Sequence, residues 1–183
     1  MNRYQLEPYR DFAQPFYAGR DPAHNFRHIE RILARLSRLS EGLEPAPCLD
    51  RLYFLACFHG LGKRLNAEPL LIEQVRDFLA GLACSETEID DLLQSLNRHL
   101  SNPQTLEEKI VYDANYLEIL GAFGIAKAFT TGGSRGQLIE ETVDIFEHQY
   151  LDKVEFQTPA GKRLADEGRA YAKAFLQRLR AEW

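Results

Sequence analysis

The sequence predicts an all-α fold in a single domain covering residues 1–183. Apolar residues recur three and four positions apart along nearly the whole chain, which is the pattern of amphipathic helices. No segment shows the alternation of apolar and polar residues that is typical of a half-buried strand. A chain of 183 residues is long enough to bury one sizeable core, and no repeat or low-complexity linker divides it.

Three helices are predicted in the first half of the chain. The first covers about residues 22–40, where several isoleucines and leucines share one face. The second covers about residues 49–58 and is expected to end at the turn that contains Gly60 and Gly62. The third covers about residues 69–82. All three present one apolar face, so they are expected to pack on a common core.

Four more helices are predicted in the second half. Two begin at sequences with the spacing of a capping box, at residues 85–88 and 105–108. The first of these runs to about residue 100, and the second is predicted as one long helix that ends before Gly132. A further helix covers about residues 137–150. The dipeptide Thr158-Pro159 is expected to cap a last helix that runs to the C-terminus.

Composition and charge exclude several classes of function. The formal net charge is −5 and there is no basic stripe, so no nucleic-acid polymer is expected as a partner. No run of about 18 apolar residues is present, so no membrane span is predicted. The cysteines, Cys48, Cys57 and Cys84, form no Cys-x-x-Cys pair, and the N-terminus has no apolar signal segment. These features predict a cytoplasmic protein and leave a homo-oligomer open.

Asp113 is a carboxylate at a position where the helical pattern calls for an apolar residue. Leu106, Ile110, Leu117 and Leu120 form one helical stripe, and Asp113 lies in the middle of it. Burying an unpaired carboxylate costs several kcal/mol, so such a residue is usually given a cation or a strong hydrogen-bond donor. The position of Asp113 therefore indicates a polar site inside the helical protein.

Three histidines are predicted to point inward in the same way. His28 shares a helix face with His24 at a spacing of four residues, so the pair could hold one metal ion, or one could ligate while the other meets substrate. His59 lies at the buried end of its helix, and His99 continues an apolar stripe, whereas His148 has charged neighbours and is expected at the surface. Each inward histidine alone is more often a core residue bonded to a carbonyl. Together with the aspartate they favour a shared metal or phosphate site.

The order of these residues resembles the HD superfamily of metal-dependent phosphohydrolases. The resemblance is carried by residues 24–32 (HNFRHIERI), 55–63 (LACFHGLGK) and 109–118 (KIVYDANYLE). Residues 120–129 (LGAFGIAKAF) and 158–162 (TPAGK) are similar to a stand-alone bacterial branch that includes nucleotide-hydrolysing members. The resemblance spans almost the whole chain and implies an HD-type helical bundle.

The resemblance also implies roles for particular residues. By position, the ligands of a divalent metal ion would be His28, His59 and Asp113. The residues that would take part in catalysis or meet the substrate are His24, Asn25 and His99. The cations that would meet the phosphate oxygens are Arg31, Lys63 and Lys127.

The chain departs from the family pattern at several of these positions. Gly60 stands where the family has the aspartate of its name, and Asn25 stands where this branch usually has another aspartate. Asn115 and Tyr116 replace an aspartate and an arginine. A metal ion would therefore have one negative ligand where the family supplies two. Because Mg²⁺ prefers carboxylate oxygen, Mn²⁺, Fe²⁺, Zn²⁺ or Ni²⁺ is expected in its place, bound weakly or not at all.

Two functions follow from this resemblance. The first is a metal-dependent phosphohydrolase with a weakened metal site, whose substrate is expected to be a nucleotide. The alternative is a catalytically degenerate HD domain that binds a phosphometabolite or a protein partner. The surviving His-His-Asp set favours the enzyme, and the lost carboxylates favour the binding domain. A purely structural module is a third alternative.

Overall fold

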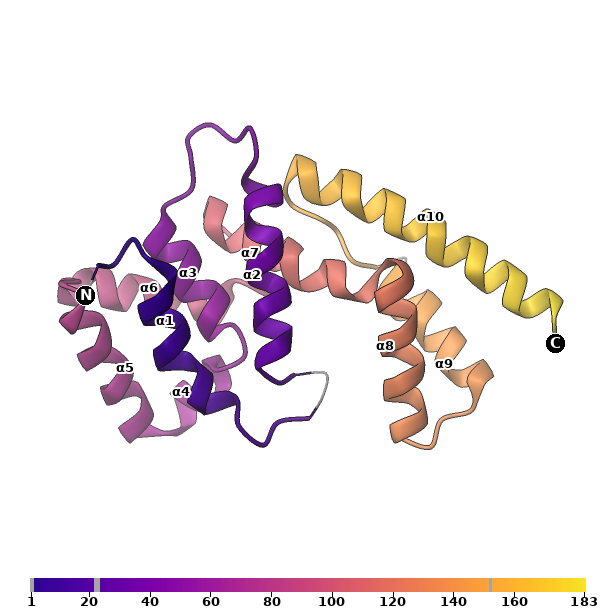
Figure 1. The fold of residues 1–183 in the computed structure, drawn as a ribbon, viewed down its shortest axis with the longest axis horizontal. Coiled ribbons are helices and arrows are strands. Elements are labelled where there is room, and N and C mark those ends of the chain that lie inside the picture. Colours follow the sequence, from indigo (N-terminus) through magenta and orange to yellow (C-terminus); the bar gives the residue numbers. More distant parts are fainter. Residues whose placement is uncertain (1, 22–23, 152) are drawn as a thin grey trace. The chain divides into compact units, whose positions relative to one another are not determined.

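The computed structural model describes residues 2–21, 24–151 and 153–183 of the chain. The described residues form helices and turns, with no strand among them, so the predicted all-α fold is confirmed (Figure 1). The chain divides into two compact units, Met1–Tyr112 and Asp113–Trp183, and each is described below by itself. Within the described part of the chain no helix has the length and apolar character of a membrane span. The single domain and the cytoplasmic location stay predictions.

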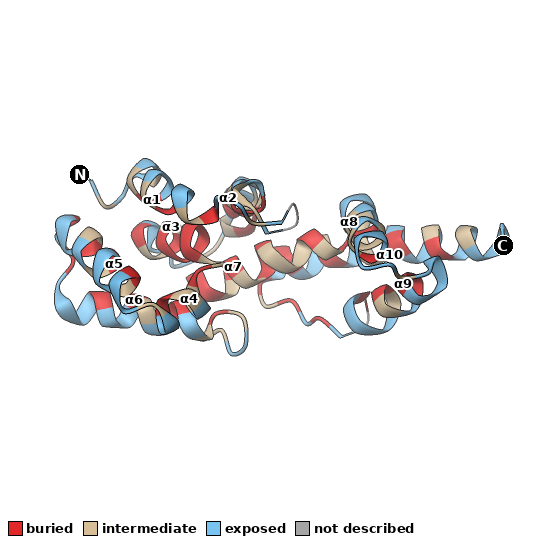
Figure 2. Cartoon of the chain, turned by 90° about the horizontal axis from the view of Figure 1, so that it is seen from below, coloured by how far each residue is buried: buried red, intermediate tan, exposed pale blue. Residues whose placement is uncertain are grey.

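The first unit is a set of helices gathered around α3. Its elements are α1 (Leu6–Ala13), a 3-10 turn (Gln14–Tyr17), α2 (Phe26–Ser40), α3 (Leu49–Phe58), α4 (Gly62–Ala67), α5 (Pro69–Gly81), α6 (Glu86–Arg98) and the larger part of α7 (Leu106–Tyr116). α3 packs against α1, α2 and α6, and it is buried over most of its length (Figure 2). It is apolar nearly all round, which is the pattern of a helix at the centre of a core. α3 therefore carries its C-terminal residues into the interior of the unit.

The local sequence accounts for several helix boundaries in this unit. α3 covers the predicted residues, and α6 begins at the predicted capping box, in which Ser85 and Glu88 exchange hydrogen bonds between side chain and backbone. The predicted first helix begins at Phe26, and the predicted residues 22 and 23 lie outside the described part of the chain. α1 and α4 are absent from the sequence prediction. α4 replaces most of the predicted glycine turn, because the backbone is already helical from Gly62.

The second unit contains the end of α7 and the helices that follow it. Its other elements are a 3-10 turn (Leu117–Ile119), α8 (Gly121–Ser134), α9 (Ile139–Ile145), a π-helical turn (Phe146–Leu151) and α10 (Pro159–Ala181). α8 packs against both α9 and α10. Thr158 caps α10 as predicted, because its hydroxyl accepts a hydrogen bond from the backbone N–H of Gly161 at 2.9 Å.

The prediction of one long helix over residues 105–131 is wrong. The chain breaks after α7, passes through the 3-10 turn and starts α8 at Gly121, whose φ is +63°. Only glycine adopts this left-handed conformation without strain, and a Cβ at Gly121 would lie 3.9 Å from the Cα of Gly168. α8 then continues through Gly132 to Ser134, past the point where the sequence predicted its end.

Candidate functional site

Three of the predicted histidines lie together in the first unit. His28 comes from the first turn of α2, His59 from the C-terminus of α3, and His99 from the C-terminus of α6. The ring centroids of His28 and His59 are 5.4 Å apart, and those of His59 and His99 are 5.1 Å apart. His28 and His99 are buried, whereas His59 is partly exposed. The structure thus brings together histidines that are far apart in the sequence, since His28 and His99 are separated by 71 positions.

A series of hydrogen bonds determines which ring nitrogen of a neutral His59 carries the proton. His99 Nδ1 lies 2.7 Å from the carbonyl oxygen of Leu96, and His99 Nε2 lies 2.9 Å from His59 Nδ1. Because a carbonyl only accepts, Nδ1 of His99 must carry its proton, and burial lowers the pKa of His99, which favours the neutral ring. Nε2 of His99 is then an acceptor, so Nδ1 of His59 donates to it. A neutral His59 therefore carries no proton on Nε2, the form that ligates a metal ion or accepts a proton.

Gly60, which follows His59, is enclosed by an arginine and a tyrosine that no sequence pattern indicated. Nη2 of Arg20 donates to the carbonyl oxygen of Gly60 at 3.0 Å, and its guanidinium carbon lies 4.8 Å from the ring centroid of Tyr17. The Tyr17 hydroxyl donates to Cys57 O at 2.8 Å and accepts from Gly60 N at 3.2 Å. Arg20 is in a loop without periodicity, so the glycine at residue 60 was the one sequence signal that could have drawn attention to it.

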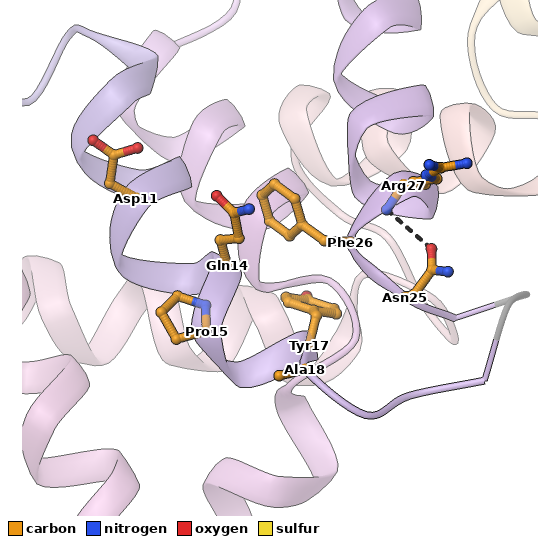
Figure 3. Close-up of a pocket in the computed structure, with 8 residues that line it drawn as sticks. All are labelled: Asp11, Gln14, Pro15, Tyr17, Ala18, Asn25, Phe26 and Arg27. Atoms are coloured by element: carbon orange, nitrogen blue, oxygen red, sulfur yellow. Dashed lines mark hydrogen bonds between the residues drawn. The ribbon is translucent and has the colours of Figure 1, made fainter.

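His24 and Asn25 lie at the start of α2, near the surface. The His24 side chain is exposed, and its Nδ1 lies 2.9 Å from a carboxylate oxygen of Asp21. The Asn25 side chain caps α2, because its Oδ1 accepts from the backbone N–H of Arg27 at 3.0 Å (Figure 3). Asn25 also lines a surface hollow of about 590 Å³, together with Asp11, Gln14 and Tyr17 among others (Figure 3). The amide of Asn25 is thus held by a structural hydrogen bond.

The three predicted phosphate-binding cations lie in different surroundings. Arg31 is half-buried on α2, and Lys63 is exposed on α4. Lys127 on α8 belongs to the second unit, where its Nζ forms an ion pair at 3.1 Å with Glu118, whose side chain is fully buried. Breaking this pair would take a cation away from a buried carboxylate, which is costly. Because Lys127 pairs with Glu118, it is less available to bind a phosphate group.

Asp113, in the second unit, is buried and satisfied by hydrogen-bond donors from the segment that leads into α10. Its Oδ1 accepts from Gln157 N at 2.8 Å, and its Oδ2 accepts from Thr158 N at 2.8 Å and from the Thr158 hydroxyl at 2.7 Å. Burial raises the pKa of Asp113, and these hydrogen bonds oppose that rise without cancelling it. The strong donor that the sequence pattern called for is therefore the backbone at the start of α10.

The predicted metal ligands remain chemically suited to an ion. A carboxylate has about four lone-pair sites that can accept a hydrogen bond or a metal ion. Asp113 accepts three hydrogen bonds, so about one lone-pair site remains. The spacing of the His28 and His59 rings, 5.4 Å between centroids, allows both imidazoles to face one ion. Among the described residues no group of three or more His, Cys, Asp or Glu side chains is placed to hold a metal ion.

Comparison with known proteins supports the HD-type fold. No protein-family model matches the chain. A solved structure described as an HD-superfamily hydrolase from Bacillus thuringiensis is similar with a TM-score of 0.77 and 24% identity, over 97% of this chain and 96% of that one. A predicted HD-superfamily hydrolase from an uncultured Thermotogales bacterium is similar with a TM-score of 0.63 and 21% identity, over 97% and 90% of the two chains. The chain therefore has the fold of the HD-superfamily hydrolases, as its motifs predicted.

One relative is found both by sequence and by structure. YpgQ of Bacillus subtilis, described as an uncharacterized protein, is 24% identical over 190 residues, which cover 96% of this chain and 92% of YpgQ. The crystal structure of YpgQ in complex with ADP is similar with a TM-score of 0.78 and 22% identity, over 97% of this chain and 94% of that one. At this level of identity the likeness establishes the fold.

Proposed function

We propose that this protein is an HD-type phosphohydrolase that acts on a small phosphorylated metabolite, namely a nucleotide. The observation that carries the proposal is the hydrogen-bond chain from Leu96 through His99 to His59. These hydrogen bonds leave Nε2 of a neutral His59 without a proton, so that it can ligate a metal ion or accept a proton. The His59 ring lies beside that of His28. A histidine with only a structural role would not need its second nitrogen to be prepared in this way.

The nucleotide is proposed from the relative rather than from this chain. YpgQ was crystallised in complex with ADP, and its fold matches this chain over nearly its whole length. In the first unit Arg31 and Lys63 would supply positive charge to phosphate oxygens. Lys127 is a weaker candidate, because it pairs with Glu118.

The ligands proposed for a divalent ion in the first unit are His28 and His59, while a ligand role for Asp113, in the second unit, rests on the sequence resemblance alone. When bound, such an ion polarises a phosphoryl oxygen and lowers the pKa of a water molecule. His99 acts through His59, since both of its ring nitrogens are occupied by protein partners, so it is proposed as a positioning residue. Asn25 holds the start of α2 and so orients the turn that carries His28.

The test is hydrolysis of a nucleotide panel by the purified protein after loading with Mn²⁺, Fe²⁺, Zn²⁺ or Ni²⁺. The expected result is turnover of at least one nucleotide, lost by a factor of about 10² or more in His59→Gln because a ligand or base is removed. His148→Gln is the matched control, since His148 is exposed on the π-helical turn. Absence of turnover with every metal and nucleotide would contradict the proposal.

The second candidate function is a binding domain without catalysis, and the surroundings of Gly60 favour it. A guanidinium, rather than a carboxylate, stands beside this residue, so the local charge suits an anion better than a cation. A binding domain would hold a nucleotide in the presence of a metal chelator and release it unchanged. Nucleotide affinity and turnover, both measured with and without chelator, separate the two functions.

A further inference from the structure

The guanidinium of Arg20 occupies the space into which a side chain at position 60 would project. A Cβ built on Gly60 would lie 2.8 Å from Nη1 of Arg20 and 3.1 Å from Cε1 of Tyr17. The first distance is shorter than real Cβ contacts allow, so a side chain at position 60 and the observed position of Arg20 exclude one another. The chain thus combines the loss of a side chain at position 60 with the gain of a positive charge in the same place.

Arg20 is held in this place by contacts on two sides. Its Nη2 donates to the Gly60 carbonyl at 3.0 Å, and its guanidinium lies over the Tyr17 ring at 4.8 Å from the centroid. Tyr17 is itself buried and fixed by hydrogen bonds to Cys57 O and Gly60 N. A guanidinium that is positioned before a ligand arrives loses little freedom on binding, which favours affinity.

The charge of Arg20 is not neutralised by a carboxylate among the residues that the structure describes. Its contacts there are the Gly60 carbonyl and the Tyr17 ring. A guanidinium has five N–H donors, and the Gly60 carbonyl uses one of them. Arg20 is also partly exposed to solvent. The remaining donors have the fork geometry that binds two phosphate oxygens at once.

We propose that Arg20 is a phosphate-binding residue, and that it binds the phosphate group of the ligand directly, without a metal ion, beside His59. This proposal rests on the proposed function, because it assumes that the ligand is a phosphorylated metabolite. The Arg20 guanidinium supplies positive charge beside Gly60, in addition to that of any divalent ion held by the proposed ligands. Gly60 leaves room for the guanidinium in its observed position.

The test is the affinity of the purified protein for ADP and for pyrophosphate, measured by calorimetry in the presence of EDTA. The unaltered protein is expected to bind both probes without metal. Arg20→Gln is expected to weaken both by about tenfold to a hundredfold, the usual contribution of hydrogen bonds to a charged group. Arg20→Lys should lose less, because it keeps the charge but lacks the fork.

The matched control is Arg38→Gln, which removes the same charge from an exposed position near the end of α2. Its affinity for both probes should equal that of the unaltered protein. Failure of the unaltered protein to bind either probe in EDTA would overturn the proposal. Equal affinity in Arg20→Gln and the unaltered protein would overturn it as well.

A measurement on the unaltered protein guards against a variant that does not fold. The ¹⁵N–¹H signal of Arg20 Nε should shift on titration with ADP in EDTA, and a signal that stays in place would contradict the proposal. The outcomes also separate this proposal from the enzymatic function. Binding that depends on Arg20 without turnover would refute the hydrolase alone, whereas turnover with an unchanged KM in Arg20→Gln would refute the role of Arg20 alone.

Discussion

Asp113 and Thr158 form a two-point contact that joins α7 to the start of α10 within the second unit. Oδ2 of Asp113 accepts both the backbone N–H and the hydroxyl of Thr158, at 2.8 Å and 2.7 Å. The same hydroxyl accepts from Gly161 N, so one threonine side chain both caps α10 and holds the carboxylate. A buried carboxylate is thereby stabilised by the positive end of a helix of 23 residues. This contact gives Asp113 a structural function whether or not it also binds an ion.

Gly161 permits this contact, which leads to a prediction for its replacement. A Cβ at this position would lie 2.1 Å from Oδ2 of Asp113 and 2.9 Å from the Thr158 hydroxyl oxygen. Gly161→Ala is therefore expected to push the carboxylate off the start of α10 and to lower the free energy of unfolding by about 2 kcal/mol, as overpacking of a buried site does. Urea denaturation measures this change.

Gly133→Ala is the control for the glycine prediction. Gly133 lies within α8 of the same unit, and a Cβ there would meet nothing within 4 Å. Replacing it is expected to stabilise the protein by about 0.5–1 kcal/mol, because alanine restricts the unfolded chain. If Gly161→Ala were as stable as Gly133→Ala, the close approach of Asp113 to α10 would be wrong.

The sequence predicted helices where their boundaries are encoded by neighbouring residues. The capping box at Ser85 and the Thr158-Pro159 dipeptide placed the starts of α6 and α10, because both act within one helical turn. The break between α7 and α8 could not be predicted in the same way. It depends on the left-handed backbone of Gly121 and on its approach to Gly168, which is 47 positions away.

The sequence predicted which residues belong to the candidate site better than it predicted the hydrogen bonds between them. The apolar stripes indicated that His28 and His99 point inward, and both are buried. The hydrogen bond between His59 and His99 depends on how α3 and α6 pack, which periodicity does not specify. Arg20 lies in a loop and reaches Gly60 across 40 positions, so no local pattern identified it.

Acid should destabilise the first unit through Glu108. Burial tends to raise the pKa of this carboxyl, but hydrogen bonds from Arg98 and from Gln104 N outweigh burial and hold it below its usual value of 4.5. Because the folded pKa is lower than the unfolded one, the stabilisation is complete above about pH 4.5 and is lost as the pH falls through the folded pKa.

Glu108→Gln tests this dependence. At neutral pH the variant should lose about 2 kcal/mol of unfolding free energy, because Arg98 loses its charged partner. The difference in unfolding free energy between the variant and the unaltered protein should become smaller at acid pH. Glu108 of the unaltered protein is then protonated and no longer stabilises the fold through its charge. Glu73→Gln, at an exposed position on α5, is the control and should follow the unaltered protein. A difference that stayed constant from neutral to acid pH would argue against a depressed pKa at Glu108.

A carboxylate introduced at position 60 should not by itself raise the affinity for a metal ion. In Gly60→Asp the new side chain would meet the Arg20 guanidinium and form an ion pair with it. We expect Mn²⁺ affinity to rise by about tenfold or more only in the double variant Gly60→Asp with Arg20→Gln, where the carboxylate has no cation beside it. Calorimetry with Mn²⁺ on both single variants and the double variant measures this. A full gain in Gly60→Asp alone would show that Arg20 does not compete for that position.

His99→Leu tests the hydrogen-bond chain that prepares His59. The leucine removes the nitrogen that accepts the hydrogen bond from His59 Nδ1. His59 should then lose its preference for the tautomer that carries its proton on Nδ1. The expected results are a change in the His59 ring ¹⁵N shifts and, where a metal ion binds, an affinity lower by about tenfold to a hundredfold. His148→Leu is the control, because His148 is exposed. Ring shifts of His59 that are the same in His99→Leu and the unaltered protein would show that His99 does not set its protonation, whatever the metal affinity.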